Sequence, residues 1–289
     1  MLDDIIKTKN ILPSVLFILI VVGITSYYHQ LGWPEITCIT GVCALVLLYT
    51  KVSHLIKSML IVNAIFVSGL VLMDFSKINH DALIAEVFIL LAFLVGRYFY
   101  KVNGRFIFVE VTLLVFLALL FYPPAIFYIL FIYSLMLFHS VKKFSTWLLP
   151  IFCLIMFMLG AFGISFLVDF NFWNYVKNQF SHFQLVYYQF SIRQLYLLIS
   201  LALFGVFALF DHFRVTFKQS IDNKKNYELV LYLLIISCLL FLLSKNALLF
   251  ILFPCSVIIS KYIYYQKNKW AKWFMILYFP VSALVWSVI

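Results

Sequence analysis

The chain has 289 residues, of which 65% are hydrophobic, and its formal net charge is +10. Only 11% of its residues are charged, whereas soluble domains have about 25%, so it has too few polar side chains to cover a soluble fold. The Lys and Arg residues stand in small groups between apolar runs, which excludes the continuous basic face of a nucleic-acid-binding domain. The composition predicts an integral membrane protein whose main partner is the lipid bilayer.

Eleven apolar runs, each bounded by charged or turn residues, are interpreted as membrane-spanning helices. In chain order these runs cover residues 11–28, 36–50, 55–73, 82–96, 106–121, 123–139, 147–168, 194–213, 228–243, 247–265 and 271–288. The shorter runs can be extended by flanking Tyr, Trp, Lys and Arg residues, whose side chains suit the headgroup region. We expect an all-α, polytopic transmembrane helical bundle of about eleven spans, forming a single integral membrane domain over residues 1–289.

The distribution of basic residues predicts the orientation of these spans, because cytoplasmic loops of membrane proteins carry an excess of Lys and Arg. If the N-terminus is cytoplasmic, all Lys and Arg residues except four fall on the cytoplasmic side. The four exceptions are Lys77, Lys177, Arg193 and Lys245. The bias persists to the last loop, where a missed or added span would have reversed it, so the C-terminus is predicted to be external.

Prolines predict two departures from a regular succession of helices and loops. The sequence Phe121-Tyr122-Pro123-Pro124 separates the fifth and sixth runs, and because proline restricts the backbone and lacks an N–H donor, it predicts a tight external turn. Pro254 lies inside the tenth run, where it predicts a kink in the helix.

The longest external segment covers residues 169–193 and mixes aromatic side chains with Asn, Gln, Lys and His. It is too polar to cross the bilayer comfortably. The mixture favours an amphipathic helix that lies in the outer membrane interface.

No sequence motif for nucleotide binding, nucleophilic hydrolysis or zinc proteolysis is present. None of the five cysteines forms a Cys-x-x-Cys pair, and the six histidines stand at span ends or in loops. Packed cysteines and interfacial histidines are the expected roles, and we expect neither a metal site nor a cofactor.

Glu86 is the leading candidate for a functional carboxylate. It lies inside the fourth predicted span, where a charged group costs a few kcal/mol, and it has no basic residue near it in sequence, whereas Glu110 follows Arg105. Asp74 and Asp81, at external span ends, are further candidates for a catalytic base or a metal ligand. The competing interpretation is that acidic residues in loops are simply solvated.

The four basic residues that oppose the positive-inside bias are candidates for binding an anionic ligand. Lys77, Lys177, Arg193 and Lys245 would lie on the external side, where any two of them could hold a phosphate through charge-assisted hydrogen bonds. The competing interpretation is that four basic residues are tolerated on this face.

Residues 97–160 contain a basic hairpin around Arg97 and Arg105, then ALLFYPPAIFYILFIYSLMLF and a following Trp147-Leu148-Leu149-Pro150. Near the C-terminus, LLSKNALLFILFPCSVIISKYI is followed by KWAKWF. These patterns resemble an uncharacterised family of bacterial polytopic inner-membrane proteins, and the resemblance implies a multi-pass protein of the plasma membrane with no assigned activity. Where that family has a Gly-Ser-Glu-like element after the Lys-Asn pair, this chain has Ala247-Leu248-Leu249.

Two classes of function remain compatible with these features. The first, which needs no catalytic residues, is an accessory or scaffold component of the cell envelope that binds other membrane proteins. The alternative is a membrane-embedded, glycosyltransferase-like enzyme or carrier that acts on a lipid-linked sugar or an anionic lipid at the outer leaflet. A secondary transporter ranks below both, because no inverted repeat is visible. Whether the protein is an enzyme is left open.

The orientation can be tested with reporter fusions. A reporter fused at Lys142 should be cytoplasmic, and one fused after Ile289 should be external, because an odd number of spans separates the two termini. If both reporters are found on the same side, the predicted topology is wrong.

Overall fold

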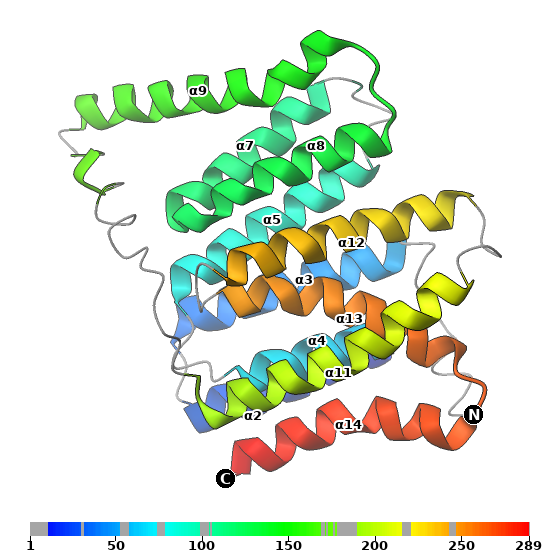
Figure 1. The fold of residues 1–289 in the computed structure, drawn as a ribbon. Helices are drawn as coiled ribbons and strands as arrows, with labels where there is room; N and C mark the ends of the chain where they lie inside the picture. The colour runs from blue at the N-terminus through cyan, green and yellow to red at the C-terminus, as the bar shows by residue number, and fades with distance from the viewer. Residues whose placement is uncertain are drawn as a thin grey trace. The chain divides into compact units, whose positions relative to one another are not determined.

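All secondary structure in the described part of the chain is helical (Figure 1), as lipid requires, since a helix satisfies its own backbone hydrogen bonds. The computed structural model describes residues 11–29, 32–52, 58–73, 79–98, 104, 106–168, 171, 173–175, 177, 190–215, 221–242 and 247–288. The helices are α2 (Leu12–His29), α3 (Trp33–Val52), α4 (Met59–Leu72), α5 (His80–Tyr98), α7 (Phe106–Phe121), η2 (Pro123–Tyr128), α8 (Ile129–Phe138), α9 (Phe144–Leu167), α11 (Ile192–Val215), α12 (Ile221–Phe241), α13 (Leu248–Tyr265) and α14 (Lys269–Val288).

Each of the eleven predicted runs contains a helix, so the all-α prediction is confirmed. Four helical segments are long and apolar enough to cross a membrane: α3, α9, α13 and residues Ile192–Asp211 of α11. Shorter apolar helices accompany them, among them α4 and α7. The chain is therefore a multi-pass membrane protein, while the number of eleven spans and their orientation stay predictions.

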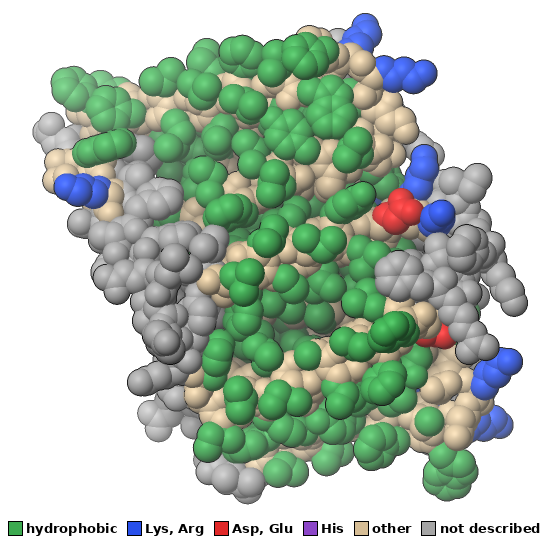
Figure 2. All heavy atoms as spheres, viewed as in Figure 1, with side chains coloured by type: hydrophobic (Ala, Val, Ile, Leu, Met, Phe, Trp, Pro, Cys, Tyr) green, Lys and Arg blue, Asp and Glu red, His purple; other side chains and the backbone are tan. Residues whose placement is uncertain are grey.

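Hydrophobic side chains cover the helices on their outer surfaces as well as inside. Figure 2 shows them along the helices that face the viewer, with visible Lys and Arg side chains toward helix ends. On α9, for example, Met156 is 67% exposed and Phe166 is 80% exposed. In water such surfaces would be unfavourable, whereas in lipid they contact acyl chains.

The described helices form two compact units. The first contains α2, α3, α4, α11, α13, α14 and most of α12. The second contains α5, α7, η2, α8, α9 and the last two turns of α12.

Helix α4 is the centre of the first unit. Every residue of α4 except Leu60 is buried, and the helix contacts α2, α3, α11, α13 and α14. Its sequence is apolar on all sides, which is typical of a helix surrounded by others. Gly69 allows close packing, because a Cβ atom at this position would overlap the side chain of Leu252 on α13.

In the second unit, α5 packs against α7 and α8 through aromatic side chains. The rings of Phe88 and Phe121 stack with centroids 6.0 Å apart, which places the first half of α5 beside the end of α7. At the other end of α5, the ring Nε2 of His139 lies 2.9 Å from the carbonyl oxygen of Gly96. The start of α5, the end of α7 and the start of η2 therefore share one end of the unit.

The Pro123-Pro124 turn is a buried 3₁₀ helix that leads directly into α8. Tyr122 is extended, and Pro123, Pro124, Ala125 and Tyr128 are all buried. Proline has no N–H group, so these two residues can be buried without leaving a backbone donor unsatisfied.

The other two interruptions expected from the sequence have different outcomes. Helix α13 continues through Pro254. The interfacial helix predicted over residues 169–193 falls largely outside the described residues and stays a prediction. Within that segment, the hydroxyl of Tyr175 donates a hydrogen bond to the carbonyl oxygen of Leu120, at 2.8 Å.

The packing of α4 can be tested at Gly69. We expect Gly69→Ala to lower the free energy of unfolding by about 1–3 kcal/mol, as overpacking does, because Leu252 is fully buried and has little room to move. The matched control is Gly163→Ala on α9, where a Cβ would meet nothing within 4 Å. Thermal unfolding in detergent measures both, and equal effects would contradict the packing described here.

Candidate functional site

Glu86 lies in the second turn of α5, at the end of the second unit formed by the α7–η2 turn. Its side chain is only 2% exposed, and its Oε2 atom has no hydrogen-bond partner. A buried polar atom without a partner loses its hydration and gains nothing in return, which is costly for a carboxyl group above all. The position predicted from the sequence as the leading candidate is thus buried and incompletely bonded.

Glu35 is the other carboxyl group with a buried, unpartnered oxygen among the described residues. Its situation differs, because its Oε1 atom lies 3.1 Å from Nε2 of His80. That carboxyl group has an interaction partner of its own, so Glu86 is the one that requires an explanation.

Close to Glu86, a buried hydrogen bond joins two distant parts of the sequence. The hydroxyl of Tyr128, the last residue of η2, lies 2.9 Å from Oγ of Ser237 on α12, and either group can donate. Tyr128 is 1% exposed and Ser237 is fully buried. The bond fixes the 3₁₀ turn against the last turns of α12.

Tyr128 also interacts electrostatically with Glu86, Tyr122 and Cys238. Glu86, Tyr122, Tyr128 and Ser237 therefore form one polar group in an apolar interior, contributed by α5, the α7–η2 turn and α12. We call these four residues the Glu86 cluster.

The Glu86 cluster combines a carboxyl group with hydroxyl groups that can both donate and accept hydrogen bonds. The free Oε2 atom can accept a hydrogen bond from a hydroxyl or ammonium group of a ligand. Among the described residues, no three His, Cys, Asp or Glu side chains come together as metal ligands would. The residues of the cluster can form hydrogen bonds and transfer protons.

The structure places Asp81 away from Glu86. Asp81 is half-buried in the first turn of α5, where a negative charge interacts favourably with the helix dipole. It is five positions from Glu86, which corresponds to about 140° around the helix, so the two side chains leave α5 on different faces. Asp74 lies outside the described residues.

Two of the four predicted anion-binding residues can be located. Lys177 is exposed and belongs to the second unit. Arg193 belongs to the first unit, and its guanidinium carbon lies 5.9 Å from the centre of the Trp286 ring. Lys77 and Lys245 lie outside the described residues, so the anionic site stays a prediction.

A family of unknown function, DUF6427, matches the chain over residues 1–289. The chain belongs to this family. No curated protein and no solved structure matches it. The sequence resemblance to an uncharacterised family thus agrees with a whole-chain match, while the bacterial inner membrane as the location of this DUF6427 protein stays a prediction.

Sequence reasoning missed the other members of the Glu86 cluster in this DUF6427 chain. Tyr122 directly precedes the Pro123-Pro124 pair, and Tyr128 ends the 3₁₀ helix that the pair begins. Both tyrosines therefore lie at a turn that the sequence marks. Ser237 gave no such signal, because it is one small polar residue in a long apolar run, 109 positions from Tyr128.

A double-mutant cycle tests the Tyr128–Ser237 bond. We expect Tyr128→Phe and Ser237→Ala each to destabilise the protein, and the pair to show a coupling of about 1 kcal/mol, the net value of one hydrogen bond. Tyr133→Phe is the control, since Tyr133 is stacked on Trp147 through its ring. Additive effects in unfolding measurements would show that the bond does not stabilise the protein.

Proposed function

We propose that this DUF6427 protein is a membrane-embedded enzyme or carrier of the bacterial inner membrane that acts on lipid-linked substrates. In this proposal Glu86 binds a polar group of the substrate. The single observation that supports it is the buried Oε2 atom of Glu86, which makes no hydrogen bond.

A purely structural role explains Glu86 poorly. Buried carboxylates that stabilise a fold are paired with a basic group and have their remaining oxygen atoms hydrogen-bonded. The oxygen of Glu86 makes no such contact, so replacing the carboxyl group by an amide or an apolar group should not weaken the bundle. Ionisable residues inside membrane spans commonly mark a functional site.

The chemistry of the cluster favours a substrate that presents hydroxyl or ammonium groups. A sugar hydroxyl can donate to Oε2 and accept from a tyrosine or serine hydroxyl. In a transferase, the carboxylate would remove the proton of an attacking hydroxyl group. In a carrier, it would serve as a hydrogen-bond acceptor only.

The predicted orientation places this chemistry near the outer leaflet. The start of α5 is predicted to be external, and Glu86 is six residues from it, or about 9 Å along the helix. The phosphate of the same substrate would then require external basic residues such as Lys177.

The scaffold function remains the second candidate, and a different observation favours it. Helix α9 packs against α7 and α8, yet only Thr146, Pro150 and Ser165 are buried on it. Gly160 and Gly163 have open space beside them, and small residues allow another membrane helix to approach closely. A partner helix could therefore bind along α9.

Substitution of Glu86 tests the first proposal. In a strain that depends on the protein, Glu86→Gln should lower activity about tenfold or more at normal protein level, because an amide cannot accept or donate a proton in the reaction as a carboxyl group does. The control is Glu110→Gln on α7, which changes a carboxyl group in an exposed position.

The same strain separates the two candidates. If Glu86→Gln complements fully, while Gly163→Leu on α9 abolishes function with the protein still inserted and folded, the enzyme or carrier proposal fails and the scaffold is favoured. If the reverse is found, Glu86 acts on a substrate.

A further inference from the structure

Basic side chains gather where α13 is connected to α14. The short connection, residues 266–268, leads from the end of α13 directly into α14 (Figure 1), and both helices belong to the first unit. Lys267 lies in the connection, and Lys269 and Lys272 lie in the first turn of α14. We call these three residues the lysine cluster.

The lysine cluster has no acidic partner among the described residues. No Asp or Glu occurs in residues 229–289, and none of the three lysines forms an ion pair in the part of the chain that the structure describes. Lys261, earlier on α13, differs from them, because Asp211 on α11 interacts with it electrostatically. No described residue therefore supplies the countercharge of the cluster.

The first turn of α14 is an unusual place for two lysines. The amino end of a helix carries the positive end of the helix dipole, so it favours anions and disfavours cations. Accordingly, α3 and α5 have Glu35 and Asp81 in their first turns, whereas α14 has Lys269 and Lys272 there and no acidic residue. The positive-inside rule requires basic residues in cytoplasmic loops, but not inside this turn. An anion bound at the cluster would offset the unfavourable interaction.

The connection holds the lysines in defined positions. The side-chain Oδ1 of Asn268 accepts a hydrogen bond from the N–H of Trp270 at 3.0 Å, and the carbonyl oxygen of Asn268 accepts one from the N–H of Lys272 at 3.0 Å. The Nζ atom of Lys272 lies 5.1 Å from the centre of the Tyr264 ring on α13. An ammonium group has three donors, so this cation–π contact leaves donors available for a ligand.

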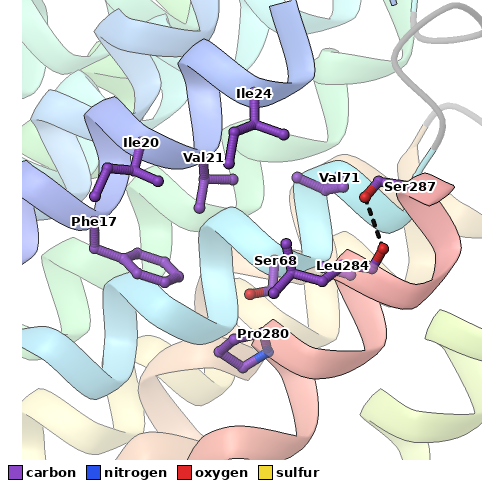
Figure 3. Close-up of a pocket in the computed structure, with 10 residues that line it drawn as sticks. Phe17, Ile20, Val21, Ile24, Ser68, Val71, Pro280, Leu284 and Ser287 are labelled. Atoms are coloured by element: carbon purple, nitrogen blue, oxygen red, sulfur yellow. Dashed lines mark hydrogen bonds between the residues drawn. The ribbon is translucent and has the colours of Figure 1, made fainter. Parts of the chain in front are cut away.

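An exposed apolar stripe begins beside the cluster and follows α14. Trp270 is 87% exposed and Phe274 is 66% exposed. The same face of the helix continues, at intervals of three or four residues, through the exposed side chains of Leu277, Val281 and Leu284. In Figure 3, Leu284 lines an apolar pocket together with side chains of α2 and α4, so the surface stays apolar beyond the middle of α14.

The two features together select an amphiphilic partner. A soluble anion or an acidic segment of another protein would match the lysines but would leave the stripe uncovered. An anionic lipid matches both, because its phosphate carries the negative charge and its acyl chains are apolar. Exposed tryptophan beside lysine is also typical of the membrane interface, where headgroups meet hydrocarbon.

We propose that the lysine cluster binds the phosphate group of an anionic glycerophospholipid, whose acyl chains lie along the apolar stripe of α14. The phosphate oxygens accept charge-assisted hydrogen bonds from the ammonium groups. The site lies at the end of the first unit that is predicted to be cytoplasmic, and it does not rest on the proposed function. It gives the protein a preference for anionic over zwitterionic lipid at this position.

Native mass spectrometry of the full-length protein tests this preference. In detergent with equal amounts of phosphatidylglycerol and phosphatidylcholine, the protein should retain phosphatidylglycerol preferentially. Lys267→Gln combined with Lys269→Gln should lower this retention about tenfold or more, because each lysine near an anionic headgroup contributes about fivefold. Retention of phosphatidylcholine should stay the same.

Lys142→Gln combined with Lys143→Gln is the matched control, because it removes the same charge from two exposed lysines that precede α9. It should leave retention unchanged, and so should Lys267→Arg combined with Lys269→Arg, which keeps the charge. Equal losses from the two glutamine pairs would show that retention follows total charge and would overturn the proposal. Unchanged retention after loss of Lys267 and Lys269 would overturn it as well. Displacement of the lipid by an equal concentration of inorganic phosphate would assign the cluster to a soluble anion instead.

Discussion

The structure depends on one constraint: within lipid, a polar group must find its hydrogen-bond partner inside the protein, because no water is available. The all-helical fold follows from it, since a helix satisfies its own backbone. The buried turn between α7 and α8 follows as well. Two prolines remove two donors there, and Ala125 donates its N–H to the carbonyl of Tyr122 at 2.8 Å, so the chain reverses direction with few groups left to satisfy.

In most places, polar side chains also find their hydrogen-bond partners inside the protein. Thr112 donates to the carbonyl of Phe108 on its own helix, and Ser134 to that of Phe131. Longer-range pairs do the same between helices: in the first unit, the hydroxyls of Tyr196 and Ser282 lie 2.7 Å apart. Such bonds connect α11 to α14 where apolar packing alone would leave their register loosely defined, because hydrogen bonds are directional and dispersion contacts are not.

Helices could be predicted from the sequence because a long apolar run is a local signal. The apolar runs that form α4 and α9 have similar compositions. The two helices differ in burial, however: α4 is buried on nearly all sides, while α9 is largely exposed. Without water there is no polar face to tell the two apart, since lipid-facing and protein-facing positions are both apolar. Small residues mark some of the positions where helices pack closely. Gly69 is such a position, because α13 packs against it, whereas Gly163 has open space beside it. The sequence alone does not distinguish the two glycines.

The candidate site could be predicted only in part, because only one of its residues gives a local signal in the sequence. Glu86 stands out because a carboxyl group inside a span is locally anomalous. Its neighbours Tyr128 and Ser237 do not, because their importance arises from a contact between residues 109 positions apart. Most buried unpartnered oxygen atoms in the described residues belong to neutral Ser, Thr, Asn or Tyr side chains, each of which costs about 1–3 kcal/mol at most when left unbonded. A carboxyl group costs more. Among the described residues, Glu86 is thus a position where the protein is incomplete by itself, because the cost of leaving a carboxyl oxygen unbonded is large.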